Sequence, residues 1–359
     1  HSEHDNLGHN FERTEPTDIG RRQYRDSTTR LGLRLAPSAS TTVLLSVTHL
    51  RGRDIYDSTF PNDGVYFRDH YDYRGTQTEL QVLGRAARWS WTAGLRYADI
   101  GRKFLSTFDT VPSSCPPPAC DSTSDVHLYN TSAYGYATWH PMRALALTAG
   151  AAFDGYKEAG SFDKSRINPK FGLRWSPTPT LAFRATEVWT LKRAQVANAT
   201  LEPTHVAGFG QFYDDLNGTT AVNRGIGVDW QPDARTTLLA EVVHRRYERP
   251  RFNPDLVLDP VRETVIRAIA NRTIGSRFAV GIEATSDLYS RRQPFVAPGG
   301  TPDAVPLQVL TTALSPSVRW VHDAGWFAIS TVNVGRQRVV RDAFYTNQGT
   351  SNFETLDLA

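Results

Sequence analysis

The segment INPKFGLRWSPTPTLAFRATEVWTLKR, Ile167 to Arg193, contains two runs in which apolar and polar residues alternate around a proline-rich turn. The apolar positions on the two sides of SPTPT are Phe171, Leu173, Trp175, Leu181, Phe183 and Ala185. The positions between them include Lys170, Arg174 and Arg184. A period of two places alternate residues on opposite faces of a β-strand. The segment is therefore predicted to form a hairpin with one apolar face and one charged face.

The same alternation recurs along the whole chain, and no helical periodicity interrupts it. It is clearest in the segments 31–35, 91–97, 145–153 and 278–284. Hydrophobic residues make up 40% of the 359 residues and charged residues 21%. No run approaches the roughly 20 apolar residues that a membrane-spanning helix requires. The sequence predicts an all-β protein and excludes a helical membrane protein.

The connections between the predicted strands alternate between short and long. The short ones are 36–40, 84–88, 140–143, 176–180, 231–235, 271–277 and 322–325. The long polar ones are 51–66, 107–127, 157–166, 193–221, 248–260 and 291–306. This arrangement is typical of bacterial outer-membrane barrels. We predict an antiparallel up-and-down transmembrane β-barrel of about 14 or more strands, with short periplasmic turns and long extracellular loops.

Tryptophan placement supports this interpretation. Seven tryptophans lie within a few residues of a short turn: Trp89, Trp91, Trp139, Trp175, Trp230, Trp320 and Trp326. The indole ring prefers the level of the lipid headgroups. We predict that these residues form an interface belt on the periplasmic side, with lipid outside and a water-filled lumen inside. Glu187, Arg224 and Arg267 do not fit, because they fall in the phase assigned to lipid.

Charged residues in the opposite phase are candidates for the lining of the lumen. They are Arg30, Arg34, Arg96, Arg174, Arg184 and Arg319, with Asp154, Asp229, Glu241 and Glu283. Such charges can select among permeating ions. Alternatively, opposite charges on neighbouring strands form a ladder that only stabilises the wall.

The long segment Ala194–Ala221 is the strongest candidate for ligand contact. It is predicted to be an extracellular loop, in which aromatic and acidic side chains can stack on a polar ligand and hydrogen-bond to it. The candidate residues are Phe209, Phe212, Tyr213, Asp214 and Asp215. The alternative is a self-packed cap over the mouth of the barrel.

Other chemistry has little support in the sequence. Cys115 and Cys120 lie in one Pro/Ser-rich loop, and we predict a disulfide between them in an oxidising compartment. Asp214, Asp215 and Asn217 lack the spacing of a calcium loop, and no cofactor or metal is expected. No catalytic fingerprint occurs, so an enzyme is not predicted. The 40 basic and 37 acidic residues form no basic stripe for nucleic acid.

Three consecutive segments carry a more specific pattern: NPKFGLRWSPTPTLAFRA, NATLEPTHVAGFGQFYDDLNGTT and GIGVDWQPDARTTLLAEVVHRRYERP. A hairpin is followed by a loop with Asn198, Leu201 and Pro203, and then by the next hairpin. Over residues 167–250 the chain resembles the barrel of TonB-dependent receptors, with Thr204 in place of the usual Glu. The resemblance implies a barrel of about 22 strands with an N-terminal plug. It also implies uptake of siderophores, cobalamin or other nutrients, driven through the TonB system.

Residues 1–359 contain no recognisable plug and no TonB box, so we expect one barrel domain from a longer protein. The alternatives are the barrel of an exopolysaccharide exporter linked to helical repeats, a general porin, and a soluble all-β binding module. The expected partners are outer-membrane lipid, the TonB system through the absent plug, and a small-molecule or polysaccharide ligand.

Overall fold

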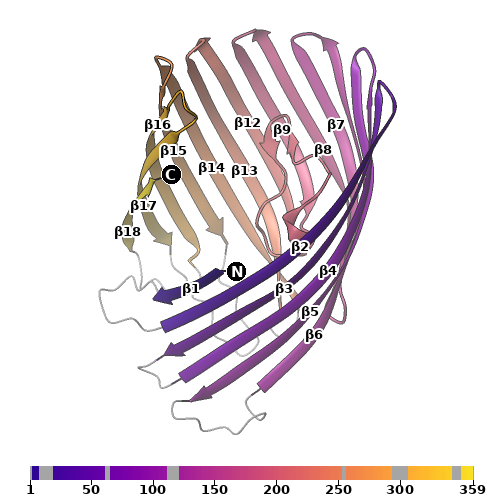
Figure 1. The fold of residues 1–359 in the computed structure, drawn as a ribbon, viewed down its shortest axis with the longest axis vertical. Helices are drawn as coiled ribbons and strands as arrows, with labels where there is room; N and C mark the ends of the chain where they lie inside the picture. The colour runs from indigo at the N-terminus through magenta and orange to yellow at the C-terminus, as the bar shows by residue number, and fades with distance from the viewer. Residues whose placement is uncertain are drawn as a thin grey trace.

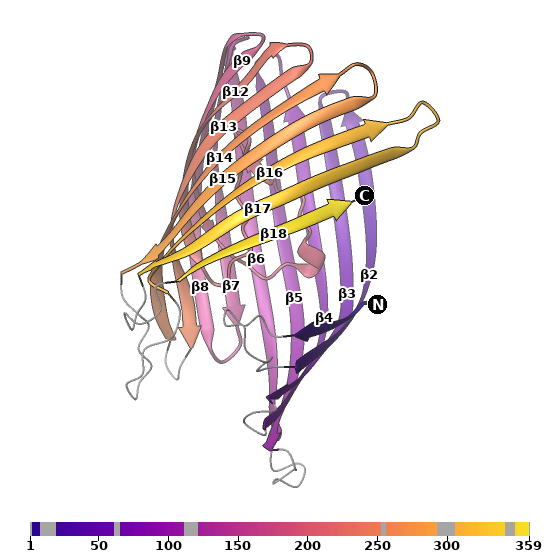
Figure 2. The same cartoon turned by 90° about the vertical axis from the view of Figure 1, so that its left-hand side faces the viewer.

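The computed structural model describes residues 2–7, 19–60, 65–110, 121–252, 256–292, 306–341 and 349–358. Sixteen strands form one antiparallel sheet in chain order, and two short strands form a separate pair. The sheet curves into an incomplete barrel (Figure 1, Figure 2), in which β1 and β18 are the edges. No helix within these ranges is long and apolar enough to cross a membrane.

The strands of the sheet differ in length. They are β1 (Ser2–Leu7), β2 (Ile19–Ser38), β3 (Thr41–Phe60), β4 (Val65–Arg85), β5 (Trp89–Thr110), β6 (Asp121–Met142), β7 (Leu145–Glu158), β8 (Phe162–Thr178), β9 (Leu181–Leu191), β12 (Thr220–Asp233), β13 (Thr236–Phe252), β14 (Leu256–Ile274), β15 (Phe278–Arg291), β16 (Gln308–Val321), β17 (Phe327–Arg341) and β18 (Thr350–Leu358). Each strand from β2 to β6 has at least 20 residues, and each strand from β7 to β9 has at most 17.

Tight turns join alternate strand pairs at the upper end of the sheet in Figure 1. Each of the seven short polar segments in the sequence coincides with one of these turns. In the turn between β12 and β13, the Asp233 carboxylate accepts hydrogen bonds from the Arg235 amide at 2.7 Å and from the Thr236 hydroxyl at 3.0 Å. The predicted all-β up-and-down fold, with its about 14 or more strands, is confirmed.

Four of the predicted long loops, 51–66, 107–127, 157–166 and 248–260, are more than half strand, and this part of the prediction was wrong. β3 continues to Phe60 and β4 begins at Val65, so most of 51–66 is paired. β5 likewise continues to Thr110. Beyond the apolar band both faces carry polar residues, so the alternation ends although the backbone ladder continues. Ion pairs such as Arg22–Asp54, at 2.6 Å, support these extensions.

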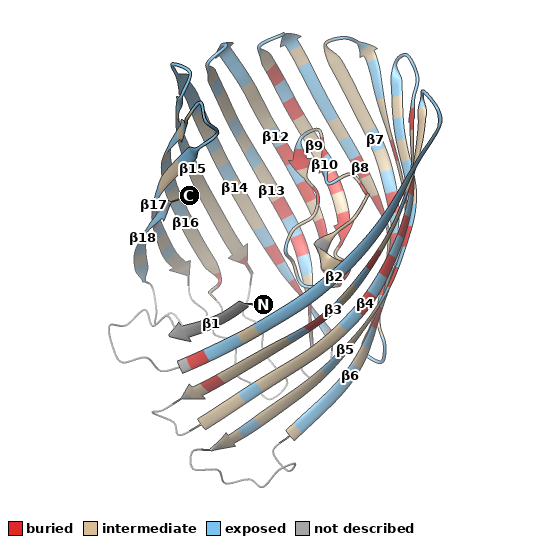
Figure 3. Ribbon diagram, viewed as in Figure 1, coloured by how far each residue is buried: buried red, intermediate tan, exposed pale blue. Residues whose placement is uncertain are grey.

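The two faces of the sheet differ as the alternation predicts. Large apolar residues are exposed on the outer face, among them Leu31 at 71%, Ile167 at 67% and Ile226 at 65%. Polar and charged residues line the inner face, where many are buried. Figure 3 places buried residues on β8, β9 and β12, and others on the longer strands β3 to β6 opposite them.

The three charges that did not fit the alternation fall into two groups. Arg267 lies on the inner face, where it bonds Glu283 at 2.7 Å, so its assignment to lipid was wrong. Glu187 and Arg224 do lie on the outer face, directly opposite each other on β9 and β12. Their side chains form an ion pair at 2.9 Å. Each charge therefore has its counter-ion on the neighbouring strand.

Candidate functional site

The segment 192–219, between β9 and β12, folds back inside the curve of the sheet (Figure 1). We call it the lumenal loop. It contains the 3-10 turn η1 (Val196–Asn198) and the hairpin of β10 (His205–Val206) and β11 (Phe209–Gly210). The sequence predicted a loop over 194–221, but Thr220 and Ala221 belong to β12. The loop lies against the inner wall and does not simply cap the mouth.

The β10–β11 hairpin has the backbone geometry of a tight two-residue turn. Ala207 and Gly208 both have positive φ, 50° and 85°. Two successive positive φ values are typical of a type I′ turn, which matches the twist of the strands that it joins. The hairpin therefore forms locally, and its position in the lumen depends on contacts with the wall.

Glu79 of β4 provides one of those contacts. Its carboxylate, 1% exposed, accepts hydrogen bonds from the backbone amides of Leu201 and Glu202 at 2.8 and 3.0 Å. The hydroxyls of Thr200 and Tyr134 also donate to it, each at 3.0 Å. A buried carboxylate requires this number of donors. Glu79 consequently fixes the turn that follows η1 to the inner face of β4.

Arg193 is the second tie between the loop and the wall. Its guanidinium bonds Asp154 of β7 at 2.6 Å and Glu202 of the loop at 2.8 Å, and all three side chains are nearly inaccessible. The Tyr136 hydroxyl donates to Glu202 at 2.6 Å. Burial opposes ionisation of Glu202, but the charges of Arg193 and Lys170 outweigh it and hold the pKa of this carboxyl below its usual value.

Glycines on the wall provide room for the loop. A Cβ at Gly225 would lie 2.6 Å from the Phe209 ring, and one at Gly172 would lie 2.8 Å from Val206. A Cβ at Gly75 would likewise lie 3.1 Å from the Val196 side chain. The wall and the loop are thus complementary in shape over three strands.

Three of the predicted ligand residues pack the lumenal loop against the wall. The Phe209 ring lies 4.6 Å from the Arg184 guanidinium carbon, and the Tyr213 ring lies 3.6 Å from that of Arg245. Asp215 forms an ion pair with Arg245 at 2.7 Å. The side chains of Phe209, Tyr213 and Asp215 therefore hold the loop against the wall.

The other two predicted ligand residues are more accessible. Asp214 is exposed, and Phe212 lines a hollow of about 440 Å³ together with Arg30, Thr204 and His205. This hollow lies between the lumenal loop and β2, and we call it the lumenal hollow. It combines a cation, a hydroxyl, an imidazole and an aromatic ring.

Five of the lumen candidates belong to a continuous ladder of alternating charge. Arg174 and Arg184 both bond Asp229, at 3.2 and 3.0 Å. Arg184 also bonds Glu241 at 3.2 Å. Arg267 then joins Glu241, at 3.9 Å, to Glu283 at 2.7 Å. This arrangement corresponds to the wall-stabilising alternative that the sequence left open.

The remaining lumen candidates have different surroundings. Arg96 is 3% exposed, and its three guanidinium nitrogens lack a hydrogen-bond partner among the described residues. Arg30, Arg34 and Arg319 are exposed and lie in the inward phase of their strands. Asp154 belongs to the Arg193 cluster.

The seven tryptophans of the predicted belt lie near the tight turns. Six of them are well exposed: Trp89, Trp91, Trp139, Trp175, Trp230 and Trp326. Trp89 stacks on Trp139 with ring centroids 5.6 Å apart. Trp320 is half-buried and lies opposite the exposed Phe278.

Two further predictions concern cysteines and metals. Cys115 and Cys120 lie outside the described residues. Within the described ranges no group of three or more His, Cys, Asp or Glu side chains could hold a metal ion.

Sequence reasoning missed Glu79, Arg193 and Glu202. One signal was present, because Gln77, Glu79 and Gln81 form a polar row opposite Thr78 and Leu80. That row predicts an inward-facing carboxylate. Its partners in the lumenal loop are more than 120 positions away in the sequence, and no local pattern identifies them.

A family model described as "TonB dependent receptor-like, beta-barrel" matches residues 3–353. No curated protein matches the chain. Similar solved structures include the ferric yersiniabactin uptake receptor FyuA from Yersinia pestis, with a TM-score of 0.67 and 14% identity, covering 96% of this chain and 55% of that one. The ferric preacinetobactin receptor BauA from Acinetobacter baumannii has a TM-score of 0.62 and 12% identity, with 94% and 56% covered. The copper transporter OprC has a TM-score of 0.62 and 11% identity, with 95% and 58% covered.

Proposed function

The chain belongs to the family of TonB-dependent receptor-like β-barrels, and on that premise we propose that it forms the barrel of an outer-membrane receptor for uptake of a scarce nutrient. It spans 55–58% of the three structures named above, so the activity is proposed for the protein that contains this barrel. The observation that carries the proposal is the lumenal loop, which Glu79 and Arg193 tie to the wall. Any ligand that crosses the lumen meets this loop.

The ligand class that we propose first is an anionic metal chelate. The lumenal hollow supports this choice, because Arg30 supplies a cation and Phe212 an aromatic surface beside Thr204 and His205. Two of the similar structures are receptors for ferric chelates and one is a copper transporter. A general porin is less compatible with the lumenal loop, since the loop occupies space that free diffusion requires.

The proposal includes a location and a partner. The tryptophan belt would mark the periplasmic interface of the outer membrane. Energy would come from the TonB system, acting on a plug outside these residues. A Cys115–Cys120 disulfide is consistent with that oxidising side of the cell envelope.

The test is uptake by cells that produce the intact protein. A strain that lacks its gene is given radioactive iron as hydroxamate, catecholate and carboxylate chelates, and radioactive cobalamin in parallel. We expect one of these activities to be lost, to return with the wild-type gene, and to require functional TonB. Uptake that is unchanged by the deletion, or that continues without TonB, would contradict the proposal. Loss of secreted polysaccharide alone would favour an exporter.

A matched pair of variants tests the lumenal hollow. Arg30→Gln removes the cation of the hollow, and Arg319→Gln removes an inward arginine outside it. We expect Arg30→Gln to raise the half-saturating chelate concentration about tenfold, since one charge-assisted contact contributes about 1.5–3 kcal/mol. Arg319→Gln should leave it unchanged. An equal rise in the half-saturating concentration for both variants would contradict chelate binding in the lumenal hollow.

A further inference from the structure

Arginine faces arginine at three places on the outer face of the sheet. Arg51 on β3 is the direct cross-strand partner of Arg74 on β4, and Arg25 on β2 is the partner of Arg53. On β13 and β14, Arg246 is the partner of Arg262. All six are exposed. Like charges directly opposite each other destabilise a sheet, so each pair requires a compensating anion.

The same chain provides that anion itself on the inner face. Arg174 and Arg184 are also direct cross-strand partners, yet Asp229 bonds both of them. Within the described residues, no carboxylate bonds Arg51, Arg74 or Arg262. The Arg246 guanidinium donates a hydrogen bond to His244, at 3.3 Å between nitrogens. Arg53 bonds Asp72 at 2.9 Å, and His70 bonds the same carboxylate.

The three pairs lie at similar heights, toward the end of the sheet opposite the tight turns. On β3, Arg51 and Arg53 follow Val43 by eight and ten residues, or about 26 and 33 Å of strand. A strand tilt of about 40° reduces these lengths to about 20 and 25 Å, close to the apolar height of an outer-membrane barrel. Leu238 and Arg246 span about 20 Å on β13 by the same calculation. The arginines therefore lie at the level of the headgroups opposite the tryptophan belt.

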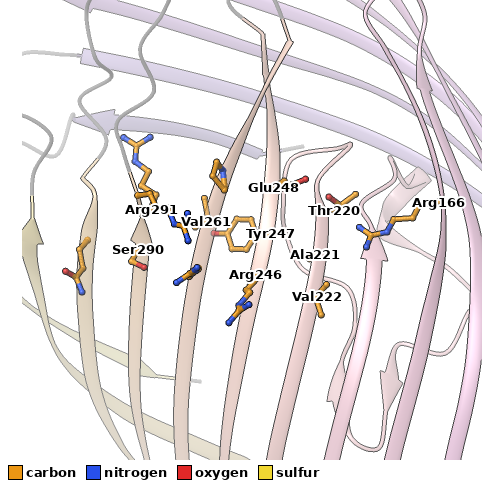
Figure 4. A pocket seen from close by; sticks show the side chains of 14 residues that line it. Arg166, Thr220, Ala221, Val222, Arg246, Tyr247, Glu248, Val261, Ser290 and Arg291 are labelled. Carbon is orange, nitrogen blue, oxygen red and sulfur yellow. The ribbon is translucent and has the colours of Figure 1, made fainter.

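Two hollows accompany the three pairs, and the two pairs on β2–β4 share one of them. The one on β2–β4, about 460 Å³, is lined by Arg25, Arg51, Arg53, Ser27 and Asp72. The one in Figure 4, about 610 Å³, lies where β12 to β15 approach their long loops and includes Arg166, Arg246 and Arg262. Ser290 and Gln308 add hydrogen-bonding groups, and Glu248 is the single carboxylate in its lining.

We propose that these hollows bind the phosphate groups of anionic lipids in the outer leaflet of the membrane. Paired guanidinium groups match phosphate, because each presents several N–H donors in a fixed plane. A lipid rather than a free anion is the occupant, since apolar side chains below each site, such as Val47 on β3 and Val242 on β13, would lie in the acyl chains of the same leaflet. The inference rests on the proposed location in an outer membrane.

The test measures the lipid that the intact protein retains. Purified protein is placed in phosphatidylcholine nanodiscs, in the same nanodiscs with diphosphorylated lipid A, and in undoped nanodiscs with inorganic phosphate. Release into the gas phase for native mass spectrometry counts the bound lipids. We expect the wild type to retain lipid A selectively, and the double variant Arg51→Gln/Arg74→Gln to bind it about 25-fold more weakly, at about fivefold for each arginine removed. Arg246→Gln/Arg262→Gln should behave alike.

The charge-matched control is Arg34→Gln/Arg319→Gln, which removes two exposed arginines from the inner face. It should retain lipid A as the wild type does. Equal retention by all three double variants would overturn the proposal, and so would displacement of lipid A by inorganic phosphate. A wild-type protein that fails to enter nanodiscs would contradict the outer-membrane location, whereas entry without selective retention would contradict only the lipid sites.

Discussion

Arginine side chains on the inner and outer faces of this sheet differ in whether a carboxylate of the same chain neutralises them. On the inner side Arg184 of β9 and Arg193 of the lumenal loop each bond two carboxylates. On the outer face Arg51 and Arg74 face each other, and no carboxylate from the part of the chain that the structure describes bonds either of them. A charge that is neutralised within the chain is explained by the fold. An arginine that lacks a counter-ion is better evidence for an external partner.

The largest expected effect comes from breaking the inner cluster. Arg193→Met leaves Asp154 and Glu202 as buried carboxylates without their shared counter-ion. We expect a loss of about 3–5 kcal/mol in the free energy of unfolding. Guanidinium unfolding of the protein in lipid vesicles measures it. Arg319→Met, an exposed inner-face control, should cost less than about 1 kcal/mol. Equal losses of unfolding free energy in the two variants would show that the ion pairs of Arg193 do not stabilise the protein more than an exposed arginine does.

The Glu187–Arg224 pair is the exception on the outer face, and it tests whether that face contacts lipid. Glu187→Leu leaves Arg224 without its counter-ion inside the apolar band. We expect a loss of about 2–4 kcal/mol in vesicles. The double variant Glu187→Leu/Arg224→Leu should recover most of that stability, because no charge remains. A double variant less stable than Glu187→Leu would indicate that the face is in water.

Glycine substitutions should give the smallest effect and separate the two faces most directly. A Cβ at Gly225 collides with Phe209 of the lumenal loop, whereas Gly135 on the outer face has no atom within 4 Å of such a Cβ. We expect Gly225→Ala to cost about 1–3 kcal/mol through overpacking. Gly135→Ala should be neutral or stabilising by up to about 1 kcal/mol. We expect proteolysis of the lumenal loop to be faster in Gly225→Ala and unchanged in Gly135→Ala, which would show that the loss of stability arises at the contact between the loop and the wall.

Much of the fold was predictable from local pattern. Alternation around SPTPT identified β8 and β9, and the register confirms it by pairing Trp175 with Phe183. The resemblance over residues 167–250 to TonB-dependent receptors is likewise confirmed by the family match. The ends of β3 and β5 were missed, because alternation disappears where both faces are polar.

The candidate site was predictable only in part. The sequence singled out the segment 194–221 for ligand contact, which stays a prediction. It did not show that the side chains of Phe209, Tyr213 and Asp215 would pack against Arg184 and Arg245. Cross-strand neighbours come from distant parts of the chain, so their identity depends on register.

The sequence by itself determined the strands, their turns and which face of each is apolar, because these depend on residues two positions apart. Only the tertiary structure decided where the segment 192–219 lies and which charges are paired. Glu79 meets Leu201, and Arg193 meets Asp154, only once the sheet has curved and the loop has entered it. The physical reason is that pairing energies depend on distance through space, whereas a sequence pattern records distance along the chain.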